Sequence, residues 1–530
     1  MFYFILFSLL FNQYPKDFNL NKHNRLERYE NITDNNLNSN SIYDIRKIDD
    51  SYLLISTGMG LSYIKFNNNQ LEETTFGSFN RNFVSLPRGG APALAVTNNI
   101  VAISGIVDTN AITGLEIKGT GISFSLDFGE SWEYLEQPID SIPNSGQYHA
   151  ISWGEQNIKT LAVTTEINNV SYDLSISEDY IYAANWAGGI RRYGPLNGLE
   201  KSWEIIPLPM DSNSKLICGS IDQNFEINPN DPRNGGNHNH KGFSVLVLND
   251  TLWAGTAYGI NKGIIESQCI NWIQHWTSDF TLGNISGNWV IGFHNQQLNE
   301  TDNRLWAITW AGAGANEKNA LSYTDDGGEN WMTTSPSGYF DKVYNLYSDQ
   351  NKIWAASALG LYLSIDGKHW EKYSDEKIDS VTGEKILAES VLTTFFDNEW
   401  LWFGTPDGLG VITNNNMSMT VHRYWDQGEP FSAYPNPFLI DEYNQVNGNG
   451  HVRFIYNNLN HLSSKIDIFD FAMERVIQLN DYNIINENET EIIWNGRNEY
   501  GNKVSNGVYF CRLSIDNNYL WTKLAIVKSN

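Results

Sequence analysis

Carboxylates on predicted loops are the residues that could most directly do chemistry in this chain. Asp108, Glu155, Glu317 and Asp407 each fall in a polar stretch between apolar segments. Glycoside hydrolysis needs two carboxylates about 5–10 Å apart across a cleft, and a sequence does not show that distance. Because the chain contains 61 acidic residues, we interpret these four as solvated surface charges and keep catalysis as the alternative.

A second candidate for chemistry is the segment NPNDPRNGGNHNHKGF, residues 228–243. Asp231, His238 and His240 are of types that ligate metals, but their spacing matches no metal-binding motif. We therefore expect a polar surface insertion, and we predict no metal site and no cofactor. Weak Ca²⁺ binding by loops rich in Asp and Asn is left open, without the spacing of an EF-hand. The sequence also lacks a Walker loop, HExxH and GxSxG.

Aromatic and basic side chains beside small residues are the third candidate, and they favour binding over catalysis. Trp186 and Trp310 each precede a run of Ala and Gly. Arg191 and Arg192 follow the first of these runs, and His294 follows the strand-like WVIGF. Small residues beside a Trp leave an open ring face, which glycan and peptide sites often need. We predict that these five residues bind a ligand; the alternative is that the Trp rings pack between sheets.

A repeated pair of short strands must position all of these side chains. The cassette IWAASALGLYLSIDGKHW, residues 353–370, joins two β-rich runs through a Gly turn. Its first run returns at residues 181–185, 252–256, 305–309 and 401–405. With less regular copies included, seven repeats fill residues 41–428. The tightest spacing is 48 residues, from Leu305 to Ile353 and again from Ile353 to Leu401.

This period predicts a β-propeller over residues 41–428. A four-stranded propeller blade takes roughly 40–50 residues, and only a closed ring of blades buries both faces of every sheet. The many aromatic residues (18 Trp, 27 Tyr and 25 Phe) and the lack of long amphipathic helical runs fit an all-β protein. We predict a seven-bladed propeller and leave six to eight blades open.

Three repeats contain the same turn, built from Ser or Thr, Asp, Gly and Trp. Short oxygen-bearing side chains can accept hydrogen bonds from the backbone of their own turn, and Gly supplies positive φ. We therefore predict a structural role for these residues. They are Ser125, Asp127, Gly129, Trp132, Thr324, Asp326, Gly328, Trp331, Ser364, Asp366, Gly367 and Trp370. The turns resemble the Asp-box (BNR) repeats of sialidase-like, sortilin-like and xyloglucanase-like propellers.

The resemblance implies a fold and not an activity, because many unrelated functions use this fold. A sialidase would need an Arg triad, a Tyr–Glu nucleophile pair and an Arg-Ile-Pro motif. Residues 86–89, with the sequence LPRG, are the nearest approach to that motif and do not match it. Sialidase activity is therefore not expected.

Residues 429–530 differ in character from the repeats. Short alternating segments follow a Pro-rich entry, and they predict a small antiparallel β-sandwich. The ordered motifs YPNPF, WNGRN, GNKV, SNGVY and TKLAIVK resemble the FlgD-like immunoglobulin fold and the type IX secretion C-terminal sorting domain. The resemblance implies a bacterial protein that uses the secretion machinery as a partner and is anchored at the outer-membrane surface or released. A plain Ig-like domain without a sorting role is the alternative.

The N-terminus begins with an apolar run, MFYFILFSLLF. It has the length of a signal-peptide core and is too short for a membrane span. We interpret residues 1–18 as a signal peptide, with truncation left open, and residues 19–40 as a loosely packed lead-in. No other stretch is apolar enough to predict a transmembrane helix.

Charge and cysteine content narrow the function further. The net charge of −26 argues against nucleic-acid binding, which needs clustered Lys and Arg. Cys218, Cys269 and Cys511 form no even-numbered framework, so we expect three buried thiols and no disulfide.

Together these features predict a secreted or cell-surface β-propeller binding protein. Its ligand would be a glycan, a peptide or another envelope protein, bound by loops on a rigid ring. One alternative is a glycoside hydrolase or lyase on an Asp-box propeller, and another is an assembly factor resembling the photosystem-stability propellers. Two carboxylates facing each other across the channel mouth would favour the enzyme.

Overall fold

The structure is a computed structural model, and nearly all of its regular structure is β-strand. Its helices, in the residues described, are the 3-10 turns η2 (Pro232–Asn234) and η3 (His238–His240). In this part of the chain, no helix is long and apolar enough to cross a membrane. The described residues are 37–67, 70–78, 85–111, 114–140, 146–167, 169–266, 269–278, 284–312, 314, 316–373, 379, 385–397, 400–413, 418–423, 430–441, 450–458, 462–480, 482–484, 489–515 and 518–528.

Seven four-stranded antiparallel sheets, each hydrogen bonded in the order of the sequence, occupy the repeat region. The first three are β1 (Ile42–Asp49), β2 (Tyr52–Thr57), β3 (Gly60–Asn67) and β4 (Gln70–Ser78); β5 (Leu94–Thr97), β6 (Ile100–Ala111), β7 (Gly114–Ser125) and β8 (Glu133–Leu135); and β11 (Ser171–Ile176), β12 (Ile181–Asn185), β13 (Gly189–Gly194) and β14 (Ser202–Ile206). The others are β16 (Gly242–Leu248), β17 (Thr251–Thr256), β18 (Gly259–Ile265) and β19 (Ile270–Trp276); β20 (Trp289–Gln297), β21 (Asn303–Trp310), β22 (Ala320–Thr324) and β23 (Met332–Thr334); β24 (Val343–Ser348), β25 (Ile353–Ser357), β26 (Gly360–Ser364) and β27 (Glu371–Lys372); and β28 (Thr393–Phe396), β29 (Trp400–Thr405), β30 (Gly408–Thr413) and β31 (Met419–His422).

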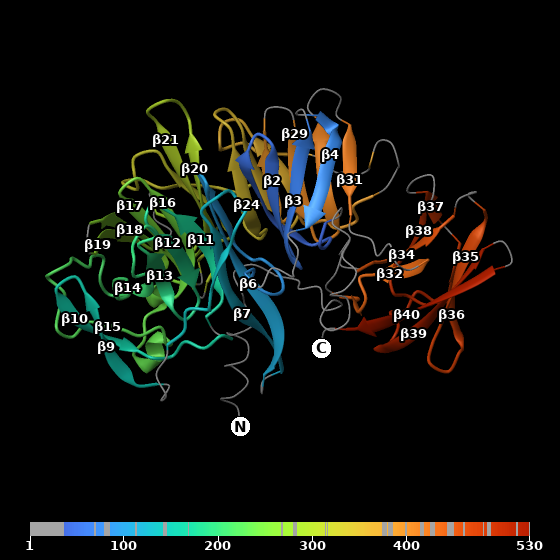
Figure 1. The fold of residues 1–530 in the computed structure, drawn as a ribbon, viewed down its shortest axis with the longest axis horizontal. Helices are drawn as coiled ribbons and strands as arrows, with labels where there is room; N and C mark the ends of the chain where they lie inside the picture. Colours follow the sequence, from blue (N-terminus) through green and yellow to red (C-terminus); the bar gives the residue numbers. More distant parts are fainter. Residues whose placement is uncertain are drawn as a thin grey trace.

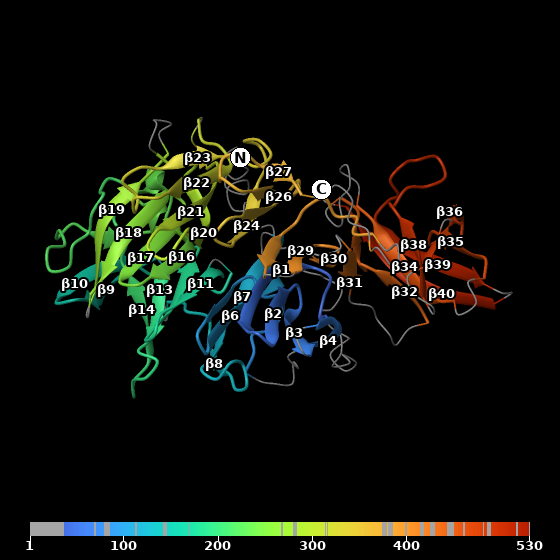
Figure 2. The same cartoon turned by 90° about the horizontal axis from the view of Figure 1, so that it is seen from above.

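The first strands of these sheets form a closed ring. Strands β1, β5, β11, β16, β20, β24 and β28 contact one another in this order, and β28 returns to β1. Figure 1 shows the closure, with the blue first sheet beside the orange last one, and Figure 2 shows the ring from above. The chain is therefore a β-propeller, as predicted, and the described sheets in the ring number seven.

The Trp of the repeated cassette explains why the sheets pack as they do. Trp253, Trp306, Trp354 and Trp402 occupy the same position of the second strand in four sheets, and each is at most 4% exposed. A buried indole removes a large apolar area from water on the face of its sheet. The Trp positions of the repeat thus belong to the cores between sheets.

The three predicted turns have one hydrogen-bond pattern. Asp127 accepts the backbone N–H of Ser131 at 2.8 Å, while the Ser125 hydroxyl accepts that of Gly129 at 2.8 Å. Asp326 and Thr324 do the same for Asn330 and Gly328. In the shortened copy, Ser364 accepts from Gly367, which has a φ of 74°. All three turns thus use their oxygen-bearing side chains to satisfy their own backbone.

A three-stranded sheet lies outside the ring, in the order β15 (Glu226–Ile227), β10 (Gln156–Leu161), β9 (Tyr148–Trp153). A disulfide joins Cys218, in the long connection that contributes β15, to Cys269, just before β19 of the fourth sheet and 51 residues away in sequence. The expectation of three thiols is therefore wrong for two of them. Cys511 is free and buried. Sequence spacing missed the pair because the two cysteines belong to different segments that meet only in the fold.

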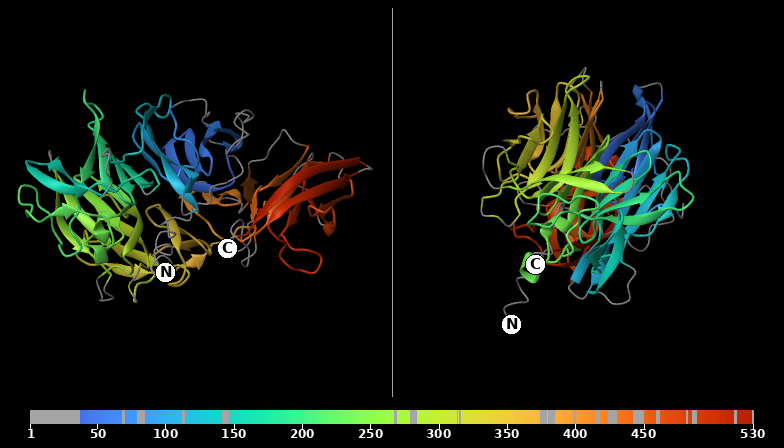
Figure 3. Two further views of the ribbon diagram at one scale, coloured as in Figure 1. Left: turned by 90° about the horizontal axis from the view of Figure 1, so that it is seen from below. Right: turned by 90° about the vertical axis from the view of Figure 1, so that its left-hand side faces the viewer.

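The C-terminal residues form two sheets that enclose a single apolar core. One sheet has the order β32 (Phe431–Tyr434), β34 (Val452–Asn457), β38 (Glu489–Trp494), β37 (Tyr482–Ile484). The other has the order β33 (Phe438–Leu439), β40 (Asn518–Val527), β39 (Gly507–Ile515), β35 (Ser464–Phe469), β36 (Arg475–Leu479). Tyr509, Cys511 and Leu513 of β39 belong to this core. Figure 3 shows this sandwich, in orange to red, at one side of the ring.

A buried ion cluster joins the sandwich to the seventh sheet. Arg453 of β34 binds Asp407, in the turn before β30, and Glu491 of β38. All three side chains are fully buried. Burial alone would lower the pKa of Arg453, but the two carboxylates raise it overall. The prediction that Asp407 is a solvated surface charge is wrong, because the sandwich covers it.

The chain enters the ring through residues 37–40, which are buried. The Asn38 amide donates to the carbonyl of Leu61 at 2.8 Å, and the Asn40 carbonyl accepts the N–H of Gly408 at 2.8 Å. These bonds connect the first and seventh sheets. The end of the predicted lead-in is thus packed rather than loose, while the predicted signal peptide lies outside the described residues.

Candidate functional site

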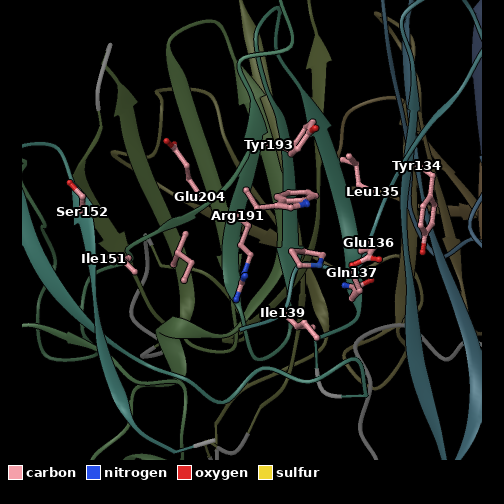
Figure 4. Close-up of a pocket in the computed structure, with 13 residues that line it drawn as sticks. Tyr134, Leu135, Glu136, Gln137, Ile139, Ile151, Ser152, Arg191, Tyr193 and Glu204 are labelled. Atoms are coloured by element: carbon pink, nitrogen blue, oxygen red, sulfur yellow. The ribbon is translucent and has the colours of Figure 1, made fainter. Parts of the chain in front are cut away.

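A cavity of about 710 Å³ opens between the outer parts of the second and third sheets. We call it the inter-sheet cavity. Its walls are residues 134–139 at and after β8, residues 203–205 of β14, Arg191 and Tyr193 of β13, and residues 151–152 of β9. Figure 4 shows these side chains, with Ser152 and Tyr134 on opposite sides and Arg191 between them.

The register of β13 and β14 places four of the lining side chains on one face. Arg191 pairs with Ile205, and Tyr193 pairs with Trp203. Successive side chains of a strand alternate between faces, so Arg192 points the other way. Its guanidinium binds Glu204 at 2.7 Å and lies 4.6 Å from the ring centroid of Tyr180.

Arg191 is a buried cation at the inner wall, with a residue exposure of 5%. Its Nη2 lies 3.2 Å from Asp140 Oδ1 and 3.4 Å from Thr164 Oγ1. Burial lowers the pKa of Arg191, although Asp140 opposes the shift. Its Nε atom is buried without a hydrogen-bond partner in the described residues. One N–H group of this paired guanidinium is thus unsatisfied in a residue that lines the cavity.

Trp203 offers a second unused donor. Its Nε1 is buried and has no hydrogen-bond partner in the described residues. The indole packs 5.3 Å from the ring of Tyr193, centroid to centroid, with the planes at 52°. Leaving a buried donor unsatisfied costs about 1–3 kcal/mol, so both donors favour a ligand with hydrogen-bond acceptors.

The other polar side chains of the cavity have structural bonds or lie at its rim. Gln137 donates to the Asn169 carbonyl and to Ser171 Oγ, and its Oε1 accepts the Gly121 N–H at 3.2 Å. These bonds fix the wall formed by residues 134–139. Glu136 is exposed, and 48% of the Glu204 side chain is exposed. The cavity thus has an aromatic and aliphatic interior, two unused donors and one exposed carboxylate, Glu136, at its rim.

The five residues predicted to bind a ligand do not lie together. Arg191 lines the inter-sheet cavity. Trp310 is only 1% exposed, and its Nε1 donates to the Val343 carbonyl at 2.9 Å. Trp186 is stacked on Phe243, with centroids 4.9 Å apart. The expected open ring face is therefore absent at Trp310 and covered on one side at Trp186.

His294 and Arg192 also have structural partners. The His294 Nε2 lies 2.7 Å from Ser348 Oγ of the next sheet, and burial lowers the pKa of His294 to about 3. Arg192 is paired with Glu204 and lies near the ring of Tyr180, as described above. A ligand-binding role for these residues and for the two Trp residues stays a prediction.

The candidate carboxylates are not collected in the cavity. Glu317 accepts the N–H groups of Asn288, Gly312 and Gly314 at 2.8–2.9 Å. Asp108 lies on β6, Glu155 is exposed, and Asp407 is buried at the sandwich. None of the four lines the inter-sheet cavity. Catalysis by a pair of them therefore has no geometric support here.

The predicted polar insertion uses its ligand-type residues internally. Asp231 binds the Arg233 guanidinium at 2.7 and 2.9 Å. His240 accepts the Asn228 N–H at its Nδ1, and its Nε2 lies 3.0 Å from the Leu208 carbonyl. Burial lowers the pKa of His240 to about 4. Among the residues described, no group of three or more His, Cys, Asp or Glu could hold a metal ion.

Sequence reasoning missed most of the cavity, including Trp203, Tyr193 and Ile139. The alternation of β14 could have placed Trp203 and Ile205 on one face. Nothing in the sequence shows that the outer ends of two sheets diverge there, because that depends on how the extra sheet packs against the ring.

No protein-family model and no curated protein matches this sequence. Similar solved structures include PorZ, a surface component of the type IX secretion system of Porphyromonas gingivalis, at 13% identity. The match covers 92% of this chain and 81% of that chain, with a TM-score of 0.31. YCF48 bound to D1 peptide matches at 14% identity over 74% of this chain and 95% of that one, with a TM-score of 0.37. Apo AztD from Citrobacter koseri matches at 8% identity over 71% and 84%, with a TM-score of 0.33. Because these TM-scores are low, the matches carry no argument about function.

Proposed function

We propose that this chain is a secreted or cell-surface β-propeller protein that binds a ligand in the inter-sheet cavity. The observation that supports binding is the pair of unused buried donors, Trp203 Nε1 and Arg191 Nε, beside an aromatic wall. A ligand with acceptor atoms would satisfy both donors and cover the apolar wall. The ligand class is a glycan, a peptide or a segment of another envelope protein.

The disulfide supports export. Disulfides form and persist in oxidising compartments and are rare in the cytosol, and Cys218 is bonded to Cys269 here. The proposed route is a type IX-like signal in residues 429–530, with the secretion machinery as partner. The full chain would be expressed in bacteria with and without a functional type IX system. Protease added to intact cells should cleave it only in the bacteria that have the system. Equal accessibility in both would contradict this route.

A blocking substitution tests the binding site. Ser152 is exposed on β9 and lines the cavity, so Ser152→Trp should fill the cavity without removing a core side chain. Ser214→Trp places the same indole on an exposed position outside the lining residues and is the matched control. Glycan and peptide arrays should contain a ligand that binds the wild type and Ser214→Trp but not Ser152→Trp. If every bound ligand is unaffected by Ser152→Trp, the site is wrong.

The enzyme and assembly-factor alternatives stay predictions. No carboxylate pair across a cleft supports a glycoside hydrolase or lyase in the described residues, since the candidate acids are apart or structurally bonded. The glycan array can include a measurement of reducing-sugar release, which a binding protein should not produce.

A further inference from the structure

Two sheet edges border the inter-sheet cavity. Strand β14 is the last strand of its sheet, and β9 is the last strand of the order β15, β10, β9. Neither has a strand partner on its outer side in the part of the chain that the structure describes. Both contribute consecutive residues to the cavity wall, 203–205 and 151–152. An unpaired edge presents a row of backbone N–H and C=O groups that can pair with an added strand.

The third wall is also a run of backbone. Residues 134–139 are all lining residues, and after Leu135 they continue beyond β8 without strand pairing. A cavity bounded by three chain segments, each of which includes part of an edge strand (β14, β9 and β8), has the form of a slot for one more extended chain. Peptide binding by strand addition uses main-chain hydrogen bonds for affinity and side-chain pockets for specificity.

The chemistry of the walls favours a peptide over a sugar. The lining includes the branched aliphatic side chains Ile139, Ile151 and Ile205 and the indole of Trp203. Such groups match β-branched or aromatic side chains. The amide of Gln137 and the Nη2 of Arg191, which could bind sugar hydroxyls, already have protein partners. Trp203 Nε1 and Arg191 Nε are donors, so each can bind a peptide carbonyl oxygen.

Charge selects the kind of peptide. The chain has a net charge of −26, and Glu136 is an exposed lining residue at the rim. The Glu204 carboxylate is paired with Arg192 and adds no free charge there. The cation of Arg191 is paired with Asp140. A basic peptide is therefore attracted to the rim, while an acidic one is repelled.

We propose that the inter-sheet cavity binds an extended peptide that pairs with the free edge of β14, with an apolar side chain against Trp203 and a Lys or Arg near the rim. This inference rests on the proposed function and specifies its ligand. Strand pairing can be distinguished from general affinity for apolar surfaces. It uses the backbone N–H groups of every second residue of the peptide, whereas contact with an apolar surface needs none of them.

Selection followed by backbone methylation tests this inference. Eight-residue peptides displayed on phage would be selected on the full-length chain, with counter-selection on Ser152→Trp. Enriched peptides should contain alternating β-branched or aromatic residues and at least one Lys or Arg. N-methylation at one set of alternate residues should weaken binding by roughly tenfold, and at the intervening set by little.

The variant Trp203→Phe adds a readout that does not depend on blocking. It keeps an aromatic ring and removes Nε1, so peptide affinity should fall about two- to tenfold. Its thermal midpoint should fall only by the packing lost from the smaller ring, because the removed N–H has no protein partner in the described residues.

The outcomes separate the two claims. A glycan that binds the wild type but not Ser152→Trp, with no peptide selected, overturns the peptide inference and leaves the proposed function in place. Selected peptides that tolerate methylation at every position also overturn it. If no glycan or peptide distinguishes the wild type from Ser152→Trp, both the proposed function and the inference fail.

Discussion

Arg453 and Asp407 form a two-point ion pair between the sandwich and the propeller. Arg453 Nε donates to Asp407 Oδ1 at 2.9 Å, and Nη2 donates to Oδ2 at 2.6 Å. The remaining terminal nitrogen, Nη1, donates to Glu491 at 2.7 Å. Arg423, also fully buried, lies 3.4 Å from Asp407 Oδ2. These directional contacts in a buried site make the relative position of the two parts specific. Because desolvation offsets much of the attraction, we expect the pair to define geometry more than to add net stability.

Removing one partner should be strongly destabilising. Asp407→Asn leaves Arg453 buried beside one carboxylate, and breaking a buried pair costs about 3–5 kcal/mol. The control is Asp441→Asn, which removes a partly exposed pair with Lys503 and should cost less than about 1 kcal/mol. Urea unfolding of both variants measures the difference. An equal, small cost for the two would contradict a buried junction.

The disulfide predicts a definite thiol count. In denaturant without reductant, the oxidised chain should show one reactive thiol, Cys511, and three after reduction, because Cys218 and Cys269 are bonded. In the chain-entropy treatment, closing a loop of this length contributes about 4 kcal/mol. The double variant Cys218→Ser, Cys269→Ser should lose up to that amount. Three thiols before reduction would rule out the bond.

Buried histidines should make the protein sensitive to acid. Burial lowers the pKa of His240 and His422 to about 4, below the ordinary value of 6.5. The unfolded chain then binds more protons between pH 6.5 and 4, so stability is complete above pH 6.5 and falls as the pH drops toward 4. Each histidine can account for about 3 kcal/mol.

The measurement is the free energy of unfolding at several pH values from 7 to 4. His240→Asn should unfold at lower denaturant concentration than the wild type at pH 7 but show a flatter dependence on pH. A wild-type stability that does not change between pH 6.5 and 4.5 would contradict neutral buried histidines.

Neighbouring aspartates distinguish a folding role from a surface charge. Asp326 accepts hydrogen bonds from the backbone N–H and the side-chain amide of Asn330 and from the hydroxyl of Thr324. Burial raises the pKa of Asp326, but these bonds outweigh it and lower the pKa to about 2. Asp326→Ala should cost about 1–3 kcal/mol. Asp325→Ala removes a two-point pair with Arg304 in which the Asp325 side chain is 48% exposed, and it should cost less than Asp326→Ala because no backbone N–H loses its acceptor. Thermal unfolding of the two variants measures the difference. A larger loss of stability in Asp325→Ala than in Asp326→Ala would contradict the folding role of Asp326.

The repeat pattern was sufficient to predict the propeller because each sheet is local in sequence. The first run of the cassette was predicted at residues 181–185, 252–256, 305–309 and 401–405, and these residues lie in the second strands β12, β17, β21 and β29. The alternating segments also predicted the small C-terminal sandwich, in which Tyr509, Cys511 and Leu513 of β39 belong to the core. These features depend on period and turn chemistry, which a single sequence displays.

The site and the junction depend on contacts between distant segments. Asp407 precedes a Gly in a turn and has the sequence signature of a surface residue, yet a residue 46 positions away covers it. Trp310 follows the pattern of an open loop aromatic, but its indole reaches the next sheet. The inter-sheet cavity arises where β8, β14 and β9 meet, and no local pattern encodes that meeting.

Amide hydrogen exchange tests the central claim most directly. Exchange in the full-length chain would be measured with and without a peptide that binds the wild type but not Ser152→Trp. We predict slower exchange in residues 202–206 and 148–153, with little change on the outer strands of the other sheets. Unchanged exchange in these two segments, with protection elsewhere, would contradict binding in the inter-sheet cavity.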